Sequence, residues 1–226
     1  MLFRSLARFL DDEALAKELV ALPPLSLFYG WIGLTFLPAL IMLTSAEAIS
    51  GELTNGSLRF SLVRTARLSF SLGKLAGQTL LMLLGVSTGA FAVWLTGYFS
   101  LASFDGPATA LWLVLLSIRV AIFSFAYVGL AVGLSHLTRL VPLSRALALG
   151  SLMLFSALYG IGKHNDALRR HAGEAVDTLL MFLPGSHASM LWQSSLLERL
   201  PALVMLVALG LVYFSLGYLY RSRRDA

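Results

Sequence analysis

The sequence predicts an all-α membrane protein, a polytopic bundle of about five spanning helices forming a single transmembrane domain over residues 1–226. Of the 226 residues, 58% are hydrophobic and 13% are charged, and the mean hydropathy is +0.80. Globular domains are about 45–50% apolar and about 25% charged, so this chain has too little polar surface for water. Its uncharged runs are also long enough to cross a bilayer, whose hydrocarbon core takes about 20 residues of helix.

These uncharged runs define the expected helices, because backbone polar groups in lipid must be paired within the helix itself. Arg145 is expected at the end of the fourth span. Arg119, at the start of the third, is expected to extend its charged end to the membrane surface. The five expected spans are 25–46, 76–100, 118–138, 143–162 and 201–220.

Small residues in two of these helices allow close approach between helix backbones. These residues could serve either internal packing or a subunit interface, and the sequence leaves both alternatives open. They are Gly85, Ser87, Gly89, Ala90, Ala92, Gly129, Ala131 and Gly133.

Basic residues are unevenly distributed between the two sides of the predicted bundle. If 47–74 is cytoplasmic, then 136–145 and 221–226 follow by alternation, and these segments hold nine basic residues against three acids. The remainder holds eight basic residues against nine acids. This difference has the sign of the positive-inside rule, so the C-terminus is expected in the cytoplasm of a cell membrane protein. The same rule explains the net charge of +5 without nucleic acid as a partner.

Five spans with a cytoplasmic C-terminus place the N-terminus outside. One interpretation is that an upstream spanning helix is missing from this sequence, and the other is that residues 1–24 are a short external segment. An amphipathic helix on the outer interface is expected there. Its apolar residues at helical spacing are Leu2, Leu6, Phe9, Leu10 and Leu15.

The largest external loop is expected at 163–199. Its polar first half is followed by the apolar run TLLMFLPGSHASMLW, which is too short to span a bilayer and suits an interfacial or re-entrant element. Pro184 and Gly185 are the expected turn. Residues 107–117 are expected at the same outer surface, before the third span.

The segment 47–74 is the charged insertion between two apolar runs. Ser50-Gly51 and the run 54–57 are turn or cap signals. Beyond them, apolar and basic residues alternate and predict a short amphipathic helix along the membrane, unless the segment is a plain positive-inside loop. The alternating residues are Leu58, Leu62, Leu68, Phe70 and Leu72, with Arg59, Arg64 and Arg67.

This segment resembles its counterpart in ABC-2 type transporter permeases. The family order is an acid, Gly-Ser/Thr-Leu, a leucine-rich stretch, a Ser-Arg-like end and a Gly-Lys that opens the next helix. Arg64 stands where the family commonly has proline, and the first of the family's six helices is not seen. Ser135 and Ser144-Arg145-Ala146 also resemble the family's later helices. The matching residues are Glu52, Gly56, Ser57, Leu58, Arg59, Leu62, Arg67, Gly73 and Lys74.

The resemblance implies a permease subunit that pairs with a second permease subunit, as a homo- or heterodimer in membrane lipid. Its 47–74 segment would be a coupling helix that docks on a separate ABC-type ATPase subunit. Glu47 and Glu52 would fix the segment by capping or by pairing with a nearby base. Substrate and direction of transport stay open. The candidate coupling residues are Glu47, Glu52, Gly56, Ser57, Leu58, Arg59, Arg64, Arg67, Gly73 and Lys74.

The sequence offers no catalytic, cofactor or metal motif. It lacks the GxxxxGK[ST] phosphate loop, has no cysteine, and disperses its four histidines, so neither an enzyme nor a metal site is expected. A secondary transporter would show broken helices and ionisable residues near mid-membrane, which are nearly absent. A secondary transporter and a non-transporting membrane scaffold remain the alternatives to the permease.

Overall fold

The computed structural model describes residues 23–56, 66–101, 104–193 and 195–224, and over these ranges the chain is helical with no β-strand. Five helices are long and apolar enough to cross a membrane. The predicted all-α polytopic helix bundle is therefore confirmed. In chain order the elements are α3 (Pro24–Ser45), α4 (Ser50–Thr54), α6 (Arg67–Ser100), α7 (Gly106–Ser135), α8 (Val141–His164), α9 (Asp166–Met181), the 3-10 turns η1 (Pro184–His187) and η2 (Ser189–Trp192), and α10 (Leu196–Arg224).

Two spanning helices begin nine or more residues earlier than the sequence predicted. α6 begins at Arg67 rather than at 76, and α7 begins at Gly106 rather than at 118. Residues 107–117 are thus the first part of α7. The start of α7 is fixed by Asp105, whose carboxylate accepts the N–H of Ala108 at 3.1 Å. The prediction missed this because it counted the residues a bilayer needs, whereas a helix can exceed the membrane's thickness.

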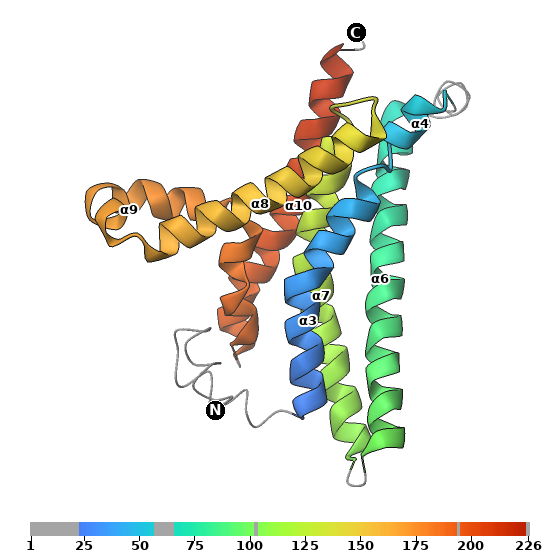
Figure 1. Cartoon of the computed structure of the whole chain (residues 1–226), viewed down its shortest axis with the longest axis vertical. Helices are drawn as coiled ribbons and strands as arrows, with labels where there is room; N and C mark the ends of the chain where they lie inside the picture. The colour runs from blue at the N-terminus through green and yellow to red at the C-terminus, as the bar shows by residue number, and fades with distance from the viewer. Residues whose placement is uncertain (1–22, 57–65, 102–103, 194, 225–226) are drawn as a thin grey trace.

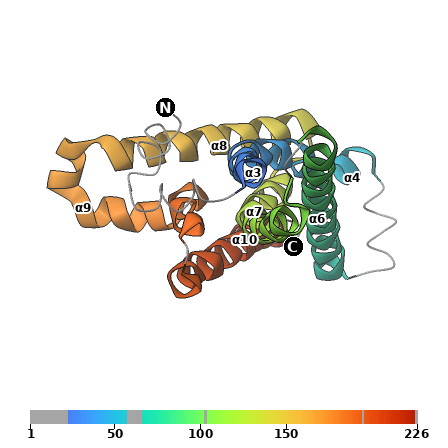
Figure 2. The same ribbon diagram turned by 90° about the horizontal axis from the view of Figure 1, so that it is seen from below.

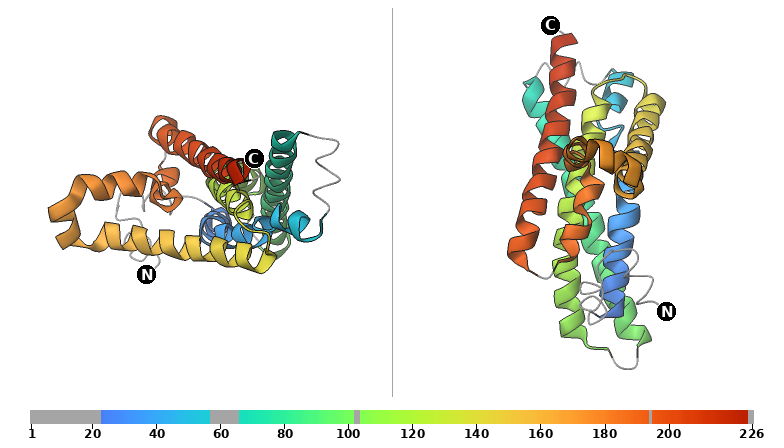
Figure 3. Two further views of the ribbon diagram at one scale, coloured as in Figure 1. Left: turned by 90° about the horizontal axis from the view of Figure 1, so that it is seen from above. Right: turned by 90° about the vertical axis from the view of Figure 1, so that its left-hand side faces the viewer.

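Helix α7 is the centre of the bundle and packs against α10, α3 and α6 (Figure 1). Ala126, Val128 and Val132 on α7 are completely buried. Helix α8 leaves the bundle obliquely, and α9 turns back beside it, so the two form an arm to one side (Figures 2 and 3).

Glycines set the distance between α7 and α10. A Cβ on Gly129 would lie 2.7 Å from the Cα of Gly210, and one on Gly133 would lie 3.0 Å from the carbonyl carbon of Tyr213. Only glycine permits this backbone contact, so the predicted close packing at Gly129 and Gly133 is confirmed as internal packing. On α6, by contrast, a Cβ at Gly85 would meet no atom within 4 Å.

Three segments grouped by charge in the sequence lie at one end of the bundle. Helix α4, the connection 136–140 and the C-terminal end of α10 are all found there, opposite the α6–α7 connection (Figure 1). The alternation derived from the basic residues therefore gives the correct grouping of helix ends.

The predicted 163–199 loop is mostly ordered structure. After α9, the chain turns at Pro184, as expected, and η1 and η2 pack against α7, α8 and α10. Leu191 is fully buried, and Trp192 lies against the Gly30 position of α3. The expected amphipathic segment within 1–24 lies almost wholly outside the described residues.

Candidate functional site

The candidate site is the short helix α4 and the contacts that hold it at one end of the bundle. The first N–H groups of any α-helix lack partners within the helix. Here the hydroxyl oxygen of Ser135, at the end of α7, accepts the N–H groups of Ile49 and Ser50, each at 2.9 Å. Ser135 therefore caps α4 from another helix, and both serines are completely buried.

A second serine fastens the turn between α3 and α4. Ser144 of α8 donates its hydroxyl to the carbonyl of Ala46, which also accepts the Ser50 hydroxyl at 3.2 Å. We call Ser50, Ser135 and Ser144 the serine clasp. The clasp joins α4 and the turn before it to α7 and α8 through buried hydrogen bonds.

Two ion pairs flank the clasp. Glu52 pairs with Lys74 of α6, and Glu47 pairs with Arg145 of α8 at 2.6 Å. Both glutamates therefore pair with a nearby base, one of the two expected arrangements, while their role in fixing a coupling segment stays a prediction. The first pair is half-buried and the second is exposed. Solvent-accessible pairs contribute about 0–1 kcal/mol each, so the buried clasp holds α4 more strongly than the ion pairs do.

The structure does not gather all of the predicted coupling residues around α4. Gly56 ends α4 with φ of 71°, the left-handed region that favours glycine. The expected amphipathic helix is not a separate element after residue 66, because Arg67 already begins α6. Gly73 and Lys74 were expected to begin the next helix, but they lie inside α6. No proline or turn signal interrupts the chain between Arg67 and Lys74. Four predicted residues lie outside the described part of the chain, namely Ser57, Leu58, Arg59 and Arg64.

His136, adjacent to the clasp, has no signal in the sequence. Its Nδ1 donates to the carbonyl of Val132 at 2.9 Å, and its Nε2 accepts the hydroxyl of Ser71 at 3.2 Å. Its ring also meets Phe214 and Tyr218 edge to face. Burial lowers the pKa of the imidazole to about 4, so at neutral pH this residue is an uncharged link between α6, α7 and α10.

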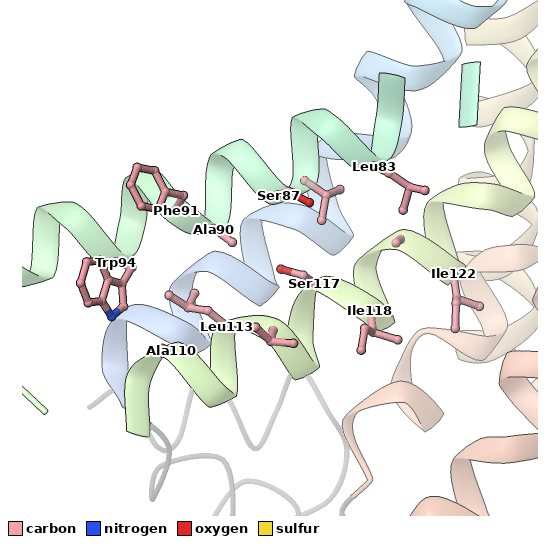
Figure 4. A pocket seen from close by; sticks show the side chains of 13 residues that line it. Leu83, Ser87, Ala90, Phe91, Trp94, Ala110, Leu113, Ser117, Ile118 and Ile122 are labelled. Carbon is pink, nitrogen blue, oxygen red and sulfur yellow. The ribbon is translucent and has the colours of Figure 1, made fainter. Parts of the chain in front are cut away.

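An apolar groove of about 670 Å³ lies between α6 and α7, towards the opposite end of the bundle (Figure 4). No charged side chain lines it. The hydroxyl of Ser117 on its wall is 3.0 Å from that of Tyr29, which donates to the carbonyl of Val86 at 2.9 Å. The lining therefore suits apolar groups, such as lipid chains, better than polar solutes.

Within the described residues, no group of three or more His, Cys, Asp or Glu side chains is placed to hold a metal ion. The side chains described around α4 are ion-paired or hydrogen-bonded to α6, α7 and α8, which attaches α4 to the bundle.

Comparison with known proteins adds no assignment. No protein-family model matches the sequence, and no curated protein matches it.

Proposed function

We propose that this chain is the permease subunit of an ABC-2 type transporter and that α4 and the residues after it form the docking site for a separate ATPase subunit. The observation that supports this most is the attachment of α4. A short helix that transmits force must be rigidly tied to spanning helices, because a flexible loop would absorb the displacement. The serine clasp and two ion pairs connect α4 to α6, α7 and α8.

The charge at this end of the bundle supports the proposed orientation. Arg67, Arg139, Arg145 and Arg221 all come from segments that meet there. Under the positive-inside rule this end faces the cytoplasm, where an ATPase would have access to ATP. The C-terminus is then cytoplasmic, in a cell membrane. A second permease subunit and the transported substrate complete the proposal, and the substrate is left unassigned.

The proposal is tested by photo-crosslinking from single positions of the full chain in its native host. A photoreactive residue replaces exposed Asn55 at the end of α4, and the matched control replaces exposed Glu198 in the first turn of α10, the end of that helix away from α4. We expect Asn55 to crosslink to a protein with a Walker A phosphate loop, identified by mass spectrometry, and Glu198 not to do so. The absence of any such ATPase from the Asn55 adducts would overturn the proposal.

The ion pair between Glu52 and Lys74 provides a second criterion. Glu52→Lys and Lys74→Glu each place like charges together, and we expect either change to lower the Asn55 crosslinking yield several-fold. The double exchange restores opposite charges, so the yield should recover. Failure of the double exchange to recover would mean that the orientation of α4 does not control docking.

A further inference from the structure

The walls of the apolar groove between α6 and α7 are partly exposed (Figure 4). Leu83 and Phe91 on α6 are 42% and 62% exposed, and Val114 and Ile118 on α7 are 58% and 52% exposed. Exposed apolar side chains on spanning helices face either lipid or another spanning helix. The groove is therefore reached sideways, from within the membrane.

Most polar side chains on the walls of the groove already have hydrogen-bond partners. The Nε1 of Trp94 donates to the carbonyl of Gly106 at 3.0 Å, and the hydroxyl of Ser117 is bonded to that of Tyr29. The hydroxyl of Ser87 is the remaining polar group among the lining side chains. An occupant of the groove is thus held by apolar contact rather than by hydrogen bonds.

Two positions on α6 mark the limits of the hydrocarbon core. Trp94 stacks on Tyr98 near the α6–α7 connection, with 5.7 Å between the ring centroids, and tryptophan and tyrosine gather at membrane surfaces. Lys74 lies 20 residues earlier on the same helix, or about 30 Å at 1.5 Å per residue. That distance equals the thickness of a hydrocarbon core. The core therefore extends along α6 from Lys74 to Trp94, with its midplane near Leu84.

The groove occupies one leaflet of this core. Its lining runs from Leu83 to Trp94 on α6 and from Ala110 to Ile122 on α7, or about 16 Å and about 18 Å along the two helices. Half of a hydrocarbon core is about 15 Å. A lipid acyl chain has the length of one leaflet, whereas a spanning helix needs a contact surface about twice as long. The groove therefore matches an acyl chain better than a helix of a second copy.

The two helices that form the groove offer a lipid headgroup almost no charge. Between 75 and 118 the sequence contains a single charged residue, Asp105, and its carboxylate caps α7. A phosphate at the level of Trp94 and Tyr98 therefore meets no basic side chain from this stretch. Recognition of a lipid by these helices depends on its acyl chain and not on the charge of its headgroup.

We propose that the groove between α6 and α7 binds an acyl chain of a membrane phospholipid. The lipid belongs to the leaflet opposite the α4 end, and its headgroup lies at the level of Trp94 and Tyr98. The site is independent of ATPase docking at α4, so either proposal can fail without the other.

The test uses the full chain purified in a neutral detergent and measures bound lipid by native mass spectrometry. Dioleoylphosphatidylcholine and dioleoylphosphatidylglycerol are titrated separately. We expect the wild type to retain one molecule of phosphatidylcholine and to bind phosphatidylglycerol with similar affinity, because the two lipids have the same acyl chains. No retained phosphatidylcholine, or binding of phosphatidylglycerol alone, would overturn the proposal.

Variants that fill the groove assign the binding to it. Ala90→Phe places a ring in the groove from α6, and we expect the apparent Kd for phosphatidylcholine to rise at least about tenfold, because the ring excludes methylene groups of the acyl chain. The matched control is Ala92→Phe, an exposed position of α6 that does not line the groove, and it should bind as the wild type does. Ala110→Phe fills the groove from α7 in case Ala90→Phe does not fold.

The same spectra report whether a second copy occupies the groove. A dimer that is lost in Ala90→Phe and kept in Ala92→Phe, with lipid binding unchanged, would identify the second copy as the occupant and contradict the acyl-chain site. An unchanged affinity for phosphatidylcholine in both Ala90→Phe and Ala110→Phe would also contradict it.

Discussion

At the residue scale, the most consequential side chain is Ser135. One buried hydroxyl oxygen accepts two N–H groups of the α4 start, at 2.9 Å each. A backbone N–H left unpaired in a buried position costs about 1–3 kcal/mol. This single uncharged side chain therefore contributes strongly to holding the start of α4 in place.

Replacing Ser135 with alanine should destabilise the protein by about 2 kcal/mol or more, because both N–H groups lose their acceptor at once. The matched control is Ser156→Ala, whose exposed hydroxyl bonds only to the Leu152 carbonyl of its own helix. That change should stay within about 0.5 kcal/mol. Equilibrium unfolding in mixed micelles with increasing dodecyl sulfate, followed by circular dichroism, measures both. Equal losses in the two variants would show that the capping of α4 adds no stability.

At the element scale, helices with similar composition have different roles because their small residues face different neighbours. Gly129 and Gly133 let α10 contact α7 along the backbone, whereas Gly150 of α8 faces open space. Lipid does not drive helices together as water does, so close backbone packing supplies much of the attraction. The α7–α10 contact is thus the tightest backbone packing described in the bundle. Helix α8, which leaves the bundle obliquely, is the least buried of the five spanning helices (Figure 3).

We expect Gly133→Ala to destabilise the bundle by at least about 1–3 kcal/mol, since its new methyl group would overlap the Tyr213 backbone. Gly150→Ala is the control, because it adds the same methyl group with no atom within 4 Å. Alanine favours helix over glycine by up to about 1 kcal/mol, so the control should be neutral or slightly stabilising. The same unfolding assay compares them, and a neutral Gly133→Ala would contradict the close packing.

At the scale of the whole molecule, charge separates the two ends of the bundle. The end with α4 and the C-terminus combines many basic residues with two paired acids. The proposed docking of an ATPase at the α4 end follows this division.

The proposed orientation can be measured directly, because the chain contains no cysteine. Single cysteines at exposed Asn55 and exposed Glu198 are treated with a membrane-impermeant maleimide in intact cells. We expect Glu198→Cys to be labelled at once and Asn55→Cys only after the membrane is permeabilised. The reverse pattern would place the α4 end outside and would exclude ATPase docking there.

Much of the fold could be predicted from the sequence, but the candidate site only in part. The pairing of Glu47 and Glu52 with bases was expected, whereas the identity of Lys74 as the partner of Glu52 required the structure. The start of α6 was missed because Arg67–Lys74 contains polar residues that a hydropathy argument assigns to a loop, although nothing in it breaks a helix. No sequence pattern predicted the role of His136.

The sequence by itself determined that this is a helical, multi-pass membrane protein and which helix ends share a side. Hydropathy and charge are sums over residues that are neighbours in the sequence, so they can be calculated without knowledge of the fold. Only the tertiary structure decided that Ser135 caps α4 across 86 positions and that Ser144 bonds to Ala46 across 98. It also decided that Arg119 is buried within α7, rather than reaching the membrane surface from the start of a helix as expected. Such contacts depend on how separate helices are rotated and shifted against one another, and this is fixed by the packing of the whole bundle.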